Sequence, residues 1–413
     1  MPVGPDGHDA TTLASEVERL QRNARARSQN RAFPLGAKWD STERHVEYLY
    51  RDDQLICEGR DLNAALEAFD LAGEARPDDV SDGPLGLKVL HVGERDAARI
   101  ADSLADIVGE DTVTPNHVLD SQGYTRMCPA TEPLPHSGPV PQLAEPHGPG
   151  HARLAVVDTG YSSEVARDSA YGRLLAVEDT SEIDDEIYGS DGQILPYGGH
   201  GTATTARLLS VSGIESTSVQ VRDCLVGGAV DELTIVEDLA TVIRDGADIV
   251  TLQAGLFTRA GRAPKSFDAL RRKILRDHPT TVIVAAAGNN GTERPFWPAA
   301  YDWTTAVGAL TYGGDARAPW SSVGHWVNVY ASGENVVVPF LNGYYEYLDG
   351  FSAEFTGGHA VWSGTSFAAP VVAGMIARRM IERGVDAPTA RDIVLREAAV
   401  AALPATGPRV LSV

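Results

Sequence analysis

The sequence is poor in cysteine and has no long apolar segment. Its 413 residues include three cysteines, Cys57, Cys128 and Cys224, which lie far apart and form no Cys-x-x-Cys pair. This scattered, odd-numbered set predicts neither a disulfide framework nor a zinc ribbon. No stretch approaches the roughly 18 apolar residues of a membrane-spanning helix, and the first residues lack the basic start and apolar core of a secretory signal. We therefore expect a cytoplasmic protein without a membrane partner; secretion by a route without a recognisable signal is the alternative.

Positive charge is also scarce. The chain has 35 Lys and Arg against 57 Asp and Glu, for a formal net charge of -22. Nucleic acids and anionic membranes bind clustered Lys and Arg, so this balance argues against both as partners. The charge leaves four other classes of partner open: proteins, peptides, basic ligands and metal cations. The hydrophobic fraction of 43% is ordinary for a folded protein with a large core.

A proline-rich segment at residues 129–150 divides the chain into an N-terminal part, residues 1–128, and a C-terminal part, residues 151–413. Proline fixes φ and removes a hydrogen-bond donor, so this segment is typical of an extended linker. In the N-terminal part, the patterns predict helices at 10–31, 62–71 and 96–108, and strands at 85–92 and 112–119. Residues 45–58 are expected to form two short strands around Asp52 and Asp53. This order predicts a small α+β domain.

The C-terminal part alternates apolar runs with helical stretches. The runs LAVVDT, VQVRDCLV, ADIVTLQA, TTVIVAAAG and TTAVGAL are apolar almost throughout. Strands that are hydrophobic on both faces and alternate with helices predict an α/β domain of three layers, with helices covering both faces of a parallel sheet. In such sheets the chemistry is expected at the carboxyl ends of the strands.

Three short motifs carry residues suited to nucleophilic catalysis. Asp158 ends the first run in VVDTG, His200 follows two glycines in GGHGT, and Ser366 opens an apolar helix in SGTSFAAP. Taken singly, each has a structural explanation, such as a turn or helix cap. Together they supply an orienting carboxylate, a general base and a nucleophile. An aspartic protease would need a second Asp-Thr/Ser-Gly motif, and an esterase of the α/β-hydrolase kind would need Gly-x-Ser-x-Gly in another order.

These segments resemble the signature segments of the subtilisin-like serine proteases, or subtilases, in order and approximate spacing. In AAAGNNG, Asn289 falls on the family's oxyanion-hole asparagine, and WPAAY, SSVG and GPRVLSV also match. The resemblance covers residues 150 to 413 and implies a subtilisin-like fold with serine endopeptidase activity and no cofactor. It implies that Ser366 attacks the peptide carbonyl, His200 transfers the proton, Asp158 orients His200, and Asn289 with the Ser366 N–H binds the oxyanion.

The substrate-binding positions depart from the family pattern. The family's Ser-Leu-Gly strand, which pairs with the substrate backbone, is here Gln253-Ala254-Gly255. Phe296 stands where small residues often line the primary pocket. We expect a shallow pocket that favours small side chains, with packing of Phe296 in the core as the alternative.

Two further segments stand out. An acidic run lies between the aspartate and histidine motifs: Glu178, Asp179, Glu182, Asp184, Asp185 and Glu186. A solvated loop is the expectation for it; a subsite for basic residues or a structural calcium site, with ligands unknown, is the alternative. Between residues 340 and 362, aromatic residues predict a hairpin that completes the core, or else a platform beside the nucleophile: Phe340, Tyr344, Tyr345, Tyr347, Phe351 and Phe355.

The N-terminal part has a strand and helix pattern similar to that of the pro-domains found in many subtilases. The resemblance implies an intramolecular inhibitor or folding domain, and a permanent adaptor domain is the alternative. For the whole chain, two alternatives to a general endopeptidase stay open. One is a catalytically silent binding protein on the same scaffold, and the other is a selective maturation protease acting on one peptide partner.

Overall fold

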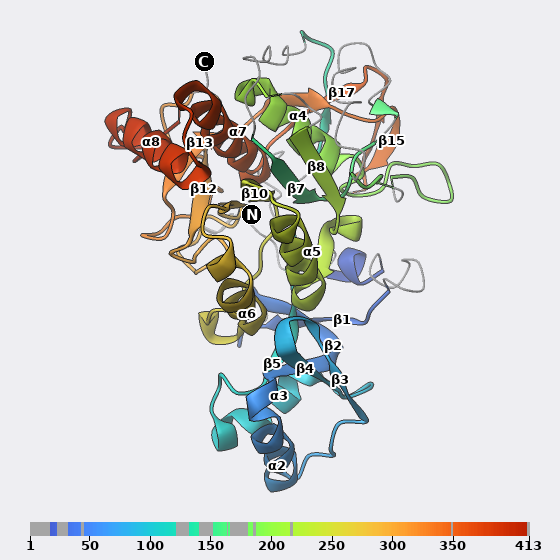
Figure 1. Cartoon of the computed structure of the whole chain (residues 1–413). Coiled ribbons are helices and arrows are strands. Elements are labelled where there is room, and N and C mark those ends of the chain that lie inside the picture. The colour runs from blue at the N-terminus through green and yellow to red at the C-terminus, as the bar shows by residue number, and fades with distance from the viewer. Residues whose placement is uncertain are drawn as a thin grey trace.

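The computed structural model describes residues 17–22, 32–42, 45–120, 132–139, 152–162, 164–165, 181–184, 187–214, 218–347 and 350–410. A smaller N-terminal part is stacked against a larger C-terminal part (Figure 1). The smaller part contains β1 (Leu35–Trp39), β2 (Val46–Glu58), α2 (Leu62–Ala72), β3 (Asp79–Asp82), β4 (Leu87–His91), α3 (Ala97–Val108) and β5 (Thr114–Asp120). Most of the helix expected at residues 10–31 lies outside the described residues. The part that is described, residues 17–22, is helical.

The sheet of the N-terminal part is antiparallel, with strand order β3-β4-β2-β5-β9 and β1 beside β2. The expectation of two short strands within residues 45–58 is wrong, because β2 is one strand of 13 residues. The chain stays extended through the acidic pair because Arg51 Nη2 lies 2.9 Å from Asp53 Oδ2. The backbone groups there are also bonded to neighbours, since Asp52 N donates to Pro34 O and Val92 N donates to Asp53 O.

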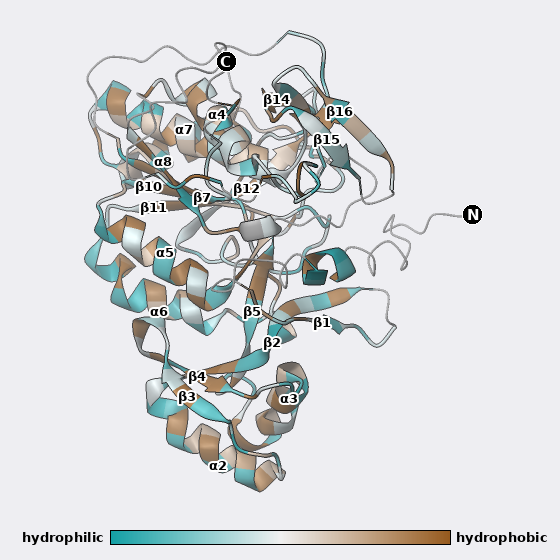
Figure 2. Ribbon diagram, turned by 90° about the vertical axis from the view of Figure 1, so that its right-hand side faces the viewer, coloured by the Kyte–Doolittle hydropathy of each residue, from teal (hydrophilic) through white to brown (hydrophobic). Residues whose placement is uncertain are grey.

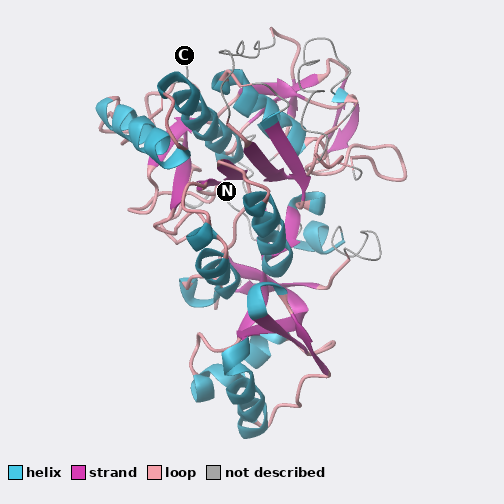
Figure 3. Cartoon of the chain, in the orientation of Figure 1, coloured by secondary structure: helices cyan, strands magenta, loops and turns pink. Residues whose placement is uncertain are grey.

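The larger part is built on a six-stranded parallel sheet with the order β13-β12-β11-β10-β7-β8. Its strands and helices are β7 (Leu154–Asp158), α4 (His200–Ser212), β8 (Val219–Asp223), β9 (Ala229–Asp231), α5 (Glu232–Arg244), β10 (Ile249–Leu252), α6 (Lys265–Lys273), β11 (Val282–Ala286), β12 (Thr304–Leu310), β13 (Val329–Ser332), α7 (Thr365–Arg383) and α8 (Ala387–Val400). Figure 3 shows the strands between two groups of helices.

Both faces of this sheet are buried, as the apolar runs predict. In β7, Leu154 and Val156 pack in the core beneath α4, α7 and α8, whereas Ala155 and Val157 pack in the core beneath α5 and α6. Successive side chains of a strand point to opposite faces, so a strand covered on both sides needs apolar residues at every position. The predicted three-layer α/β architecture is therefore confirmed.

Two small antiparallel sheets flank the main sheet. One has the order β14-β17-β6 and contains β6 (Leu134–Pro135), β14 (Val336–Pro339) and β17 (His359–Trp362), and the other pairs β15 (Gly343–Glu346) with β16 (Ser352–Phe355). The aromatic segment forms the expected hairpin, whose buried members Phe340, Tyr345 and Phe355 are each 1% exposed. Two other aromatic side chains of this segment do not contribute to the core, since Tyr344 is 56% and Phe351 73% exposed.

The two parts share a continuous set of contacts. In Figure 2, β5 runs from the smaller part towards the larger one, where it pairs with β9. Leu55 and Cys57 of β2 pack under α2 and α3, but Ile56 between them packs with Leu233 and Ala269 of α5 and α6. The N-terminal sheet therefore buries one face against its own helices and the other against the C-terminal part. No helix in the described ranges is long and apolar enough to cross a membrane.

Candidate active site

Strand ends and helix starts bring the predicted site residues to one edge of the parallel sheet. Asp158 ends β7, Gln253 follows β10 and Asn289 lies three residues after β11. His200 begins α4, and Ser366 is the second residue of α7. The carboxyl ends of parallel strands lie on the same side of a sheet, which explains how segments far apart in sequence meet here.

Asp158 and His200 form a buried pair. His200 Nδ1 lies 2.7 Å from Asp158 Oδ1, and the two residues are 2% and 0% exposed. Asp158 also accepts hydrogen bonds from Thr159 N at 2.8 Å and from the Thr204 hydroxyl at 2.9 Å. The Asp158 carboxylate is therefore held from three sides, with His200 Nδ1 as one of its partners; a proton on Nδ1 would leave the lone pair on Nε2.

The glycines around His200 permit the close approach of α4 to the loop after β7. A Cβ atom on Gly201 would lie 2.0 Å from the carbonyl oxygen of Gly160. The imidazole of His200 is buried. The ring is enclosed edge-on by aromatic rings, with centroids 6.0 Å from Tyr197, 5.2 Å from Trp362 and 5.5 Å from Phe367. Tyr197 precedes His200 by three residues, whereas Trp362 and Phe367 come from distant segments, so no local signal could reveal those two contacts.

Ser366 lies in the first turn of α7 and is 3% exposed. Among the described residues its hydroxyl donates to the carbonyl oxygen of Gln253 at 3.2 Å. The neighbouring Phe367 packs on the His200 ring, so the start of α7 lies next to the imidazole. The hydrogen bond between a nucleophile and its base is often formed only in the substrate complex.

Asn289 is anchored by Thr365, the residue before Ser366. Its side-chain oxygen accepts hydrogen bonds from Thr365 N and from the Thr365 hydroxyl, both at 2.9 Å. The same hydroxyl accepts from Gly288 N at 3.1 Å. With the oxygen held in this way, the NH₂ group of Asn289 is turned away from Thr365. Sequence reasoning missed Thr365, which lies within the serine motif, and Thr204, which lies two residues after the histidine motif.

The substrate-binding residues predicted from sequence take different positions. The Gln253 side chain is 1% exposed and contacts the Thr251 hydroxyl at 2.7 Å, and Ala254 is a core residue. Gly255 presents its backbone, whose N–H and carbonyl pair with Asp120 at 3.2 and 2.9 Å. Side chains at the first two positions therefore face the interior, and only the backbone is left to meet a peptide.

Phe296 belongs both to the core and to a cavity. It is 2% exposed, packs with a group of alanines and lies 5.3 Å from the Phe257 ring, measured between centroids. A Cβ atom on Gly255 would lie 2.3 Å from the Phe296 ring, so only glycine fits beside it. Gly255 and Phe296 both line a cavity of about 840 Å³, called here the Gly255 cavity.

Two members of the acidic run are described, and both have partners within the protein. Glu182 lies 2.9 Å from Arg222, and its other oxygen accepts from Asp223 N at 2.8 Å. Asp184 is 4% exposed and accepts from Gly199 N at 2.9 Å, which supports the turn before His200. The remaining four, Glu178, Asp179, Asp185 and Glu186, lie outside the described residues. Within the described ranges, no three His, Cys, Asp or Glu residues are grouped as a metal site.

Comparison with known proteins agrees with this geometry. Residues 152–404 match the sequence model of the subtilase family. The chain is 26% identical over 232 residues to the thermophilic serine proteinase of Bacillus sp. (strain AK1), covering 56% of this chain and 52% of that protein. It is 29% identical over 289 residues to mycosin-4 of Mycobacterium tuberculosis (strain ATCC 25618 / H37Rv), covering 62% and 61%. The chain thus spans about half to three fifths of the length of these relatives.

Solved structures support the fold. Fervidolysin from Fervidobacterium pennivorans, a keratinolytic enzyme related to subtilisin, superposes with a TM-score of 0.55 at 16% identity. The match covers 88% of this chain and 60% of that one. Because the family match extends over more than half of the 413 residues and the parallel sheet has the corresponding architecture, the chain belongs to the subtilase family.

Proposed function

We propose that the chain is a serine endopeptidase that works through an acyl-enzyme intermediate. The observation that carries the proposal is the buried Asp158–His200 pair, with a nitrogen-to-oxygen distance of 2.7 Å, packed against Phe367, the residue after Ser366 at the start of α7. A catalytically silent binding protein would not need Asn289 tied to the nucleophile's neighbour. Membership of the subtilase family supports the same reaction.

The proposed reaction begins with attack of Ser366 Oγ on the peptide carbonyl carbon, while His200 Nε2 takes the hydroxyl proton. Asp158 then stabilises the imidazolium, which it contacts through Nδ1. The carbonyl oxygen becomes negative and is bound by the Ser366 N–H, at the positive end of α7, and by the Asn289 NH₂ group. Collapse of the intermediate breaks the C–N bond, and His200 returns the proton to the leaving amine. Water repeats the sequence and releases the acid.

The test compares wild-type protein with Ser366→Ala in casein hydrolysis and in labelling by a fluorophosphonate probe. We expect labelling and hydrolysis in the wild type and neither in the variant. Undiminished hydrolysis by purified Ser366→Ala protein would refute the assignment. Absence of both labelling and hydrolysis in the wild type, under conditions where the chain is folded, would favour the catalytically silent binding protein.

We also propose that the N-terminal part is an intramolecular inhibitor. The end of β5 continues into an antiparallel bridge in which Asp120 pairs with Gly255 through both backbone groups. Gly255 belongs to the segment expected to bind the substrate backbone by strand addition. A peptide cannot pair with these groups of Gly255 while Asp120 is bound to them. This arrangement favours an inhibitor over an adaptor, which would leave the edge open.

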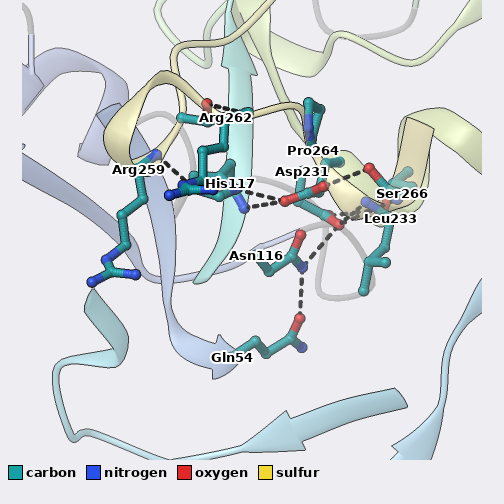
Figure 4. Close-up of polar contacts among 12 residues, drawn as sticks. Gln54, Asn116, His117, Asp231, Leu233, Arg259, Arg262, Pro264 and Ser266 are labelled. Carbon is teal, nitrogen blue, oxygen red and sulfur yellow. Dashed lines mark hydrogen bonds and ion pairs between the residues drawn. The ribbon is translucent and has the colours of Figure 1, made fainter. Parts of the chain in front are cut away.

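A buried polar network supports this attachment (Figure 4). His117 of β5 is 2% exposed, and its Nδ1 lies 2.8 Å from an oxygen of Glu232, which is fully buried. Arg259 N donates to His117 Nε2 at 3.2 Å, and the Ser266 hydroxyl donates to the second Glu232 oxygen at 2.5 Å. Buried charged groups are costly to leave without partners, so separation of the two parts requires these bonds to be broken together.

Mass spectrometry of the wild-type and Ser366→Ala chains tests the inhibitor proposal. We expect a cut between residues 121 and 150 that depends on Ser366, with peptidase activity rising as the cut appears. Full activity of an uncut wild-type chain would contradict the proposal and favour the adaptor.

A further inference from the structure

The Gly255 cavity lies between the two parts of the chain and beside the proposed nucleophile. Residues of the segments 255–261 and 290–296 line it from the C-terminal part, and Asp40 with residues of the segments 45–49 and 118–120 lines it from the N-terminal part. The first segment follows Gln253, whose carbonyl bonds the Ser366 hydroxyl, and the second follows Asn289. A side chain of a bound peptide at the position now held by Asp120 would therefore enter this cavity.

The C-terminal wall of the cavity has a single charged lining residue, Arg294. Its guanidinium lies over the Phe257 ring, with Cζ 4.2 Å from the ring centroid. One nitrogen, Nη2, donates to the backbone carbonyl of Glu47 at 2.7 Å. Within the described ranges no carboxylate forms an ion pair with Arg294, whereas most arginines of α6 and α7 have such a partner, for example Arg271 with Asp302. Arg294 therefore stacks on the Phe257 ring, and some of its guanidinium N–H groups can donate to a further acceptor.

The partly buried environment of Arg294 makes it energetically costly to leave the guanidinium without a carboxylate partner. Burial lowers the pKa of its guanidinium, and the nearby Glu47 carboxylate acts in the opposite direction. Arginine stays protonated in proteins, so the energetic cost of desolvation has to be offset by acceptors. A backbone carbonyl offsets this desolvation cost only in part. A carboxylate could offset more of it, because it would accept two hydrogen bonds from the guanidinium in a bidentate geometry.

The opposing wall has the opposite charge. The N-terminal part contributes three carboxylate residues to the cavity lining, Asp40, Glu47 and Asp120. One of them, Asp120, occupies the strand-addition position opposite Gly255. If the N-terminal part stands in for a bound peptide, its acidic side chains indicate what the cavity accepts, because complementary charge gives specificity across an interface.

We propose that Arg294 is a specificity-determining residue that selects peptide substrates with an acidic side chain, aspartate or glutamate, in the Gly255 cavity. The inference rests on the proposed endopeptidase function and names its substrate class. Phe296 lines the same cavity beside Gly255.

The experiment uses the full chain and fluorogenic peptides in which one position at a time is Glu, Gln, Lys or Ala on the acyl side of the scissile bond. Glutamine is the neutral isostere of glutamate, so the ratio of kcat/KM for Glu over Gln isolates the charge. Inhibition by the N-terminal part lowers the rates for all peptides together and cancels from the ratio. We expect a Glu over Gln ratio of about 10 to 100 at one position, the range for a hydrogen-bonded charge.

The variants are Arg294→Gln, Arg294→Glu and, as a control with the same loss of charge, Arg271→Gln on the exposed face of α6. We expect the ratio to fall to about 1 in Arg294→Gln, to favour Lys in Arg294→Glu, and to be unchanged in Arg271→Gln. Hydrolysis without any preference for Glu, or a preference that survives in Arg294→Gln, would overturn the inference and leave the endopeptidase proposal standing. Absence of any Ser366-dependent hydrolysis would overturn both.

Discussion

Thr365→Val tests how Asn289, the proposed oxyanion-binding group, is held in place. The substitution keeps the shape of the side chain but removes a hydroxyl that donates to Asn289 Oδ1 at 2.9 Å and accepts from Gly288 N at 3.1 Å. The backbone bond from Thr365 N to Asn289 remains. Loss of one hydrogen bond and of a buried acceptor for Gly288 N is worth about 1–2 kcal/mol. If this loss of about 1–2 kcal/mol weakens the binding of the transition state alone, kcat falls about 5- to 30-fold.

The assay measures kcat and KM on one peptide for Thr365→Val and for the conservative variant Thr365→Ser. We expect kcat to fall and KM to stay constant in the valine variant, because the oxyanion forms only in the transition state. The serine variant keeps the hydroxyl and should retain near wild-type kcat. Thermal unfolding shows whether the valine variant is folded. An unchanged kcat in folded Thr365→Val, or an equal loss in Thr365→Ser, would refute the positioning role.

Other predictions concern the site, the interface and metal binding. Asn289→Ala should lower kcat by about 10²–10³ with little change in KM, the scale known for the corresponding donor in subtilisin. His117→Ala should lower the free energy of unfolding by about 3 kcal/mol, because the fully buried Glu232 loses a charged hydrogen bond. The matched change His45→Ala removes an exposed pair with Asp40 and should cost less than about 1 kcal/mol in the same urea titration. For the acidic run we expect a solvated loop, so EDTA should leave the unfolding temperature unchanged; a lower temperature in EDTA would favour the alternative, a structural calcium site.

Much of the fold follows from local patterns. The helix predicted at 62–71 corresponds to α2 (Leu62–Ala72), and the one at 96–108 to α3 (Ala97–Val108). The doubly apolar runs become strands of the parallel sheet because covered strands need apolar residues on both faces. The extended β2 was not foreseen, because the acidic pair in its middle is neutralised and bonded by neighbouring strands and loops.

The sequence by itself determined the family, the three-layer fold and the candidate residues Asp158, His200, Ser366 and Asn289, because short motifs at strand and helix ends carry them. Only the tertiary structure decided what surrounds these residues. The contacts of Trp362 and Phe367 with His200, the anchoring of Asn289 and the pairing of Asp120 with Gly255 all join segments that lie far apart in the chain. Contacts of this kind leave no periodic or local signal, since each depends on how separate elements pack rather than on the residues beside it.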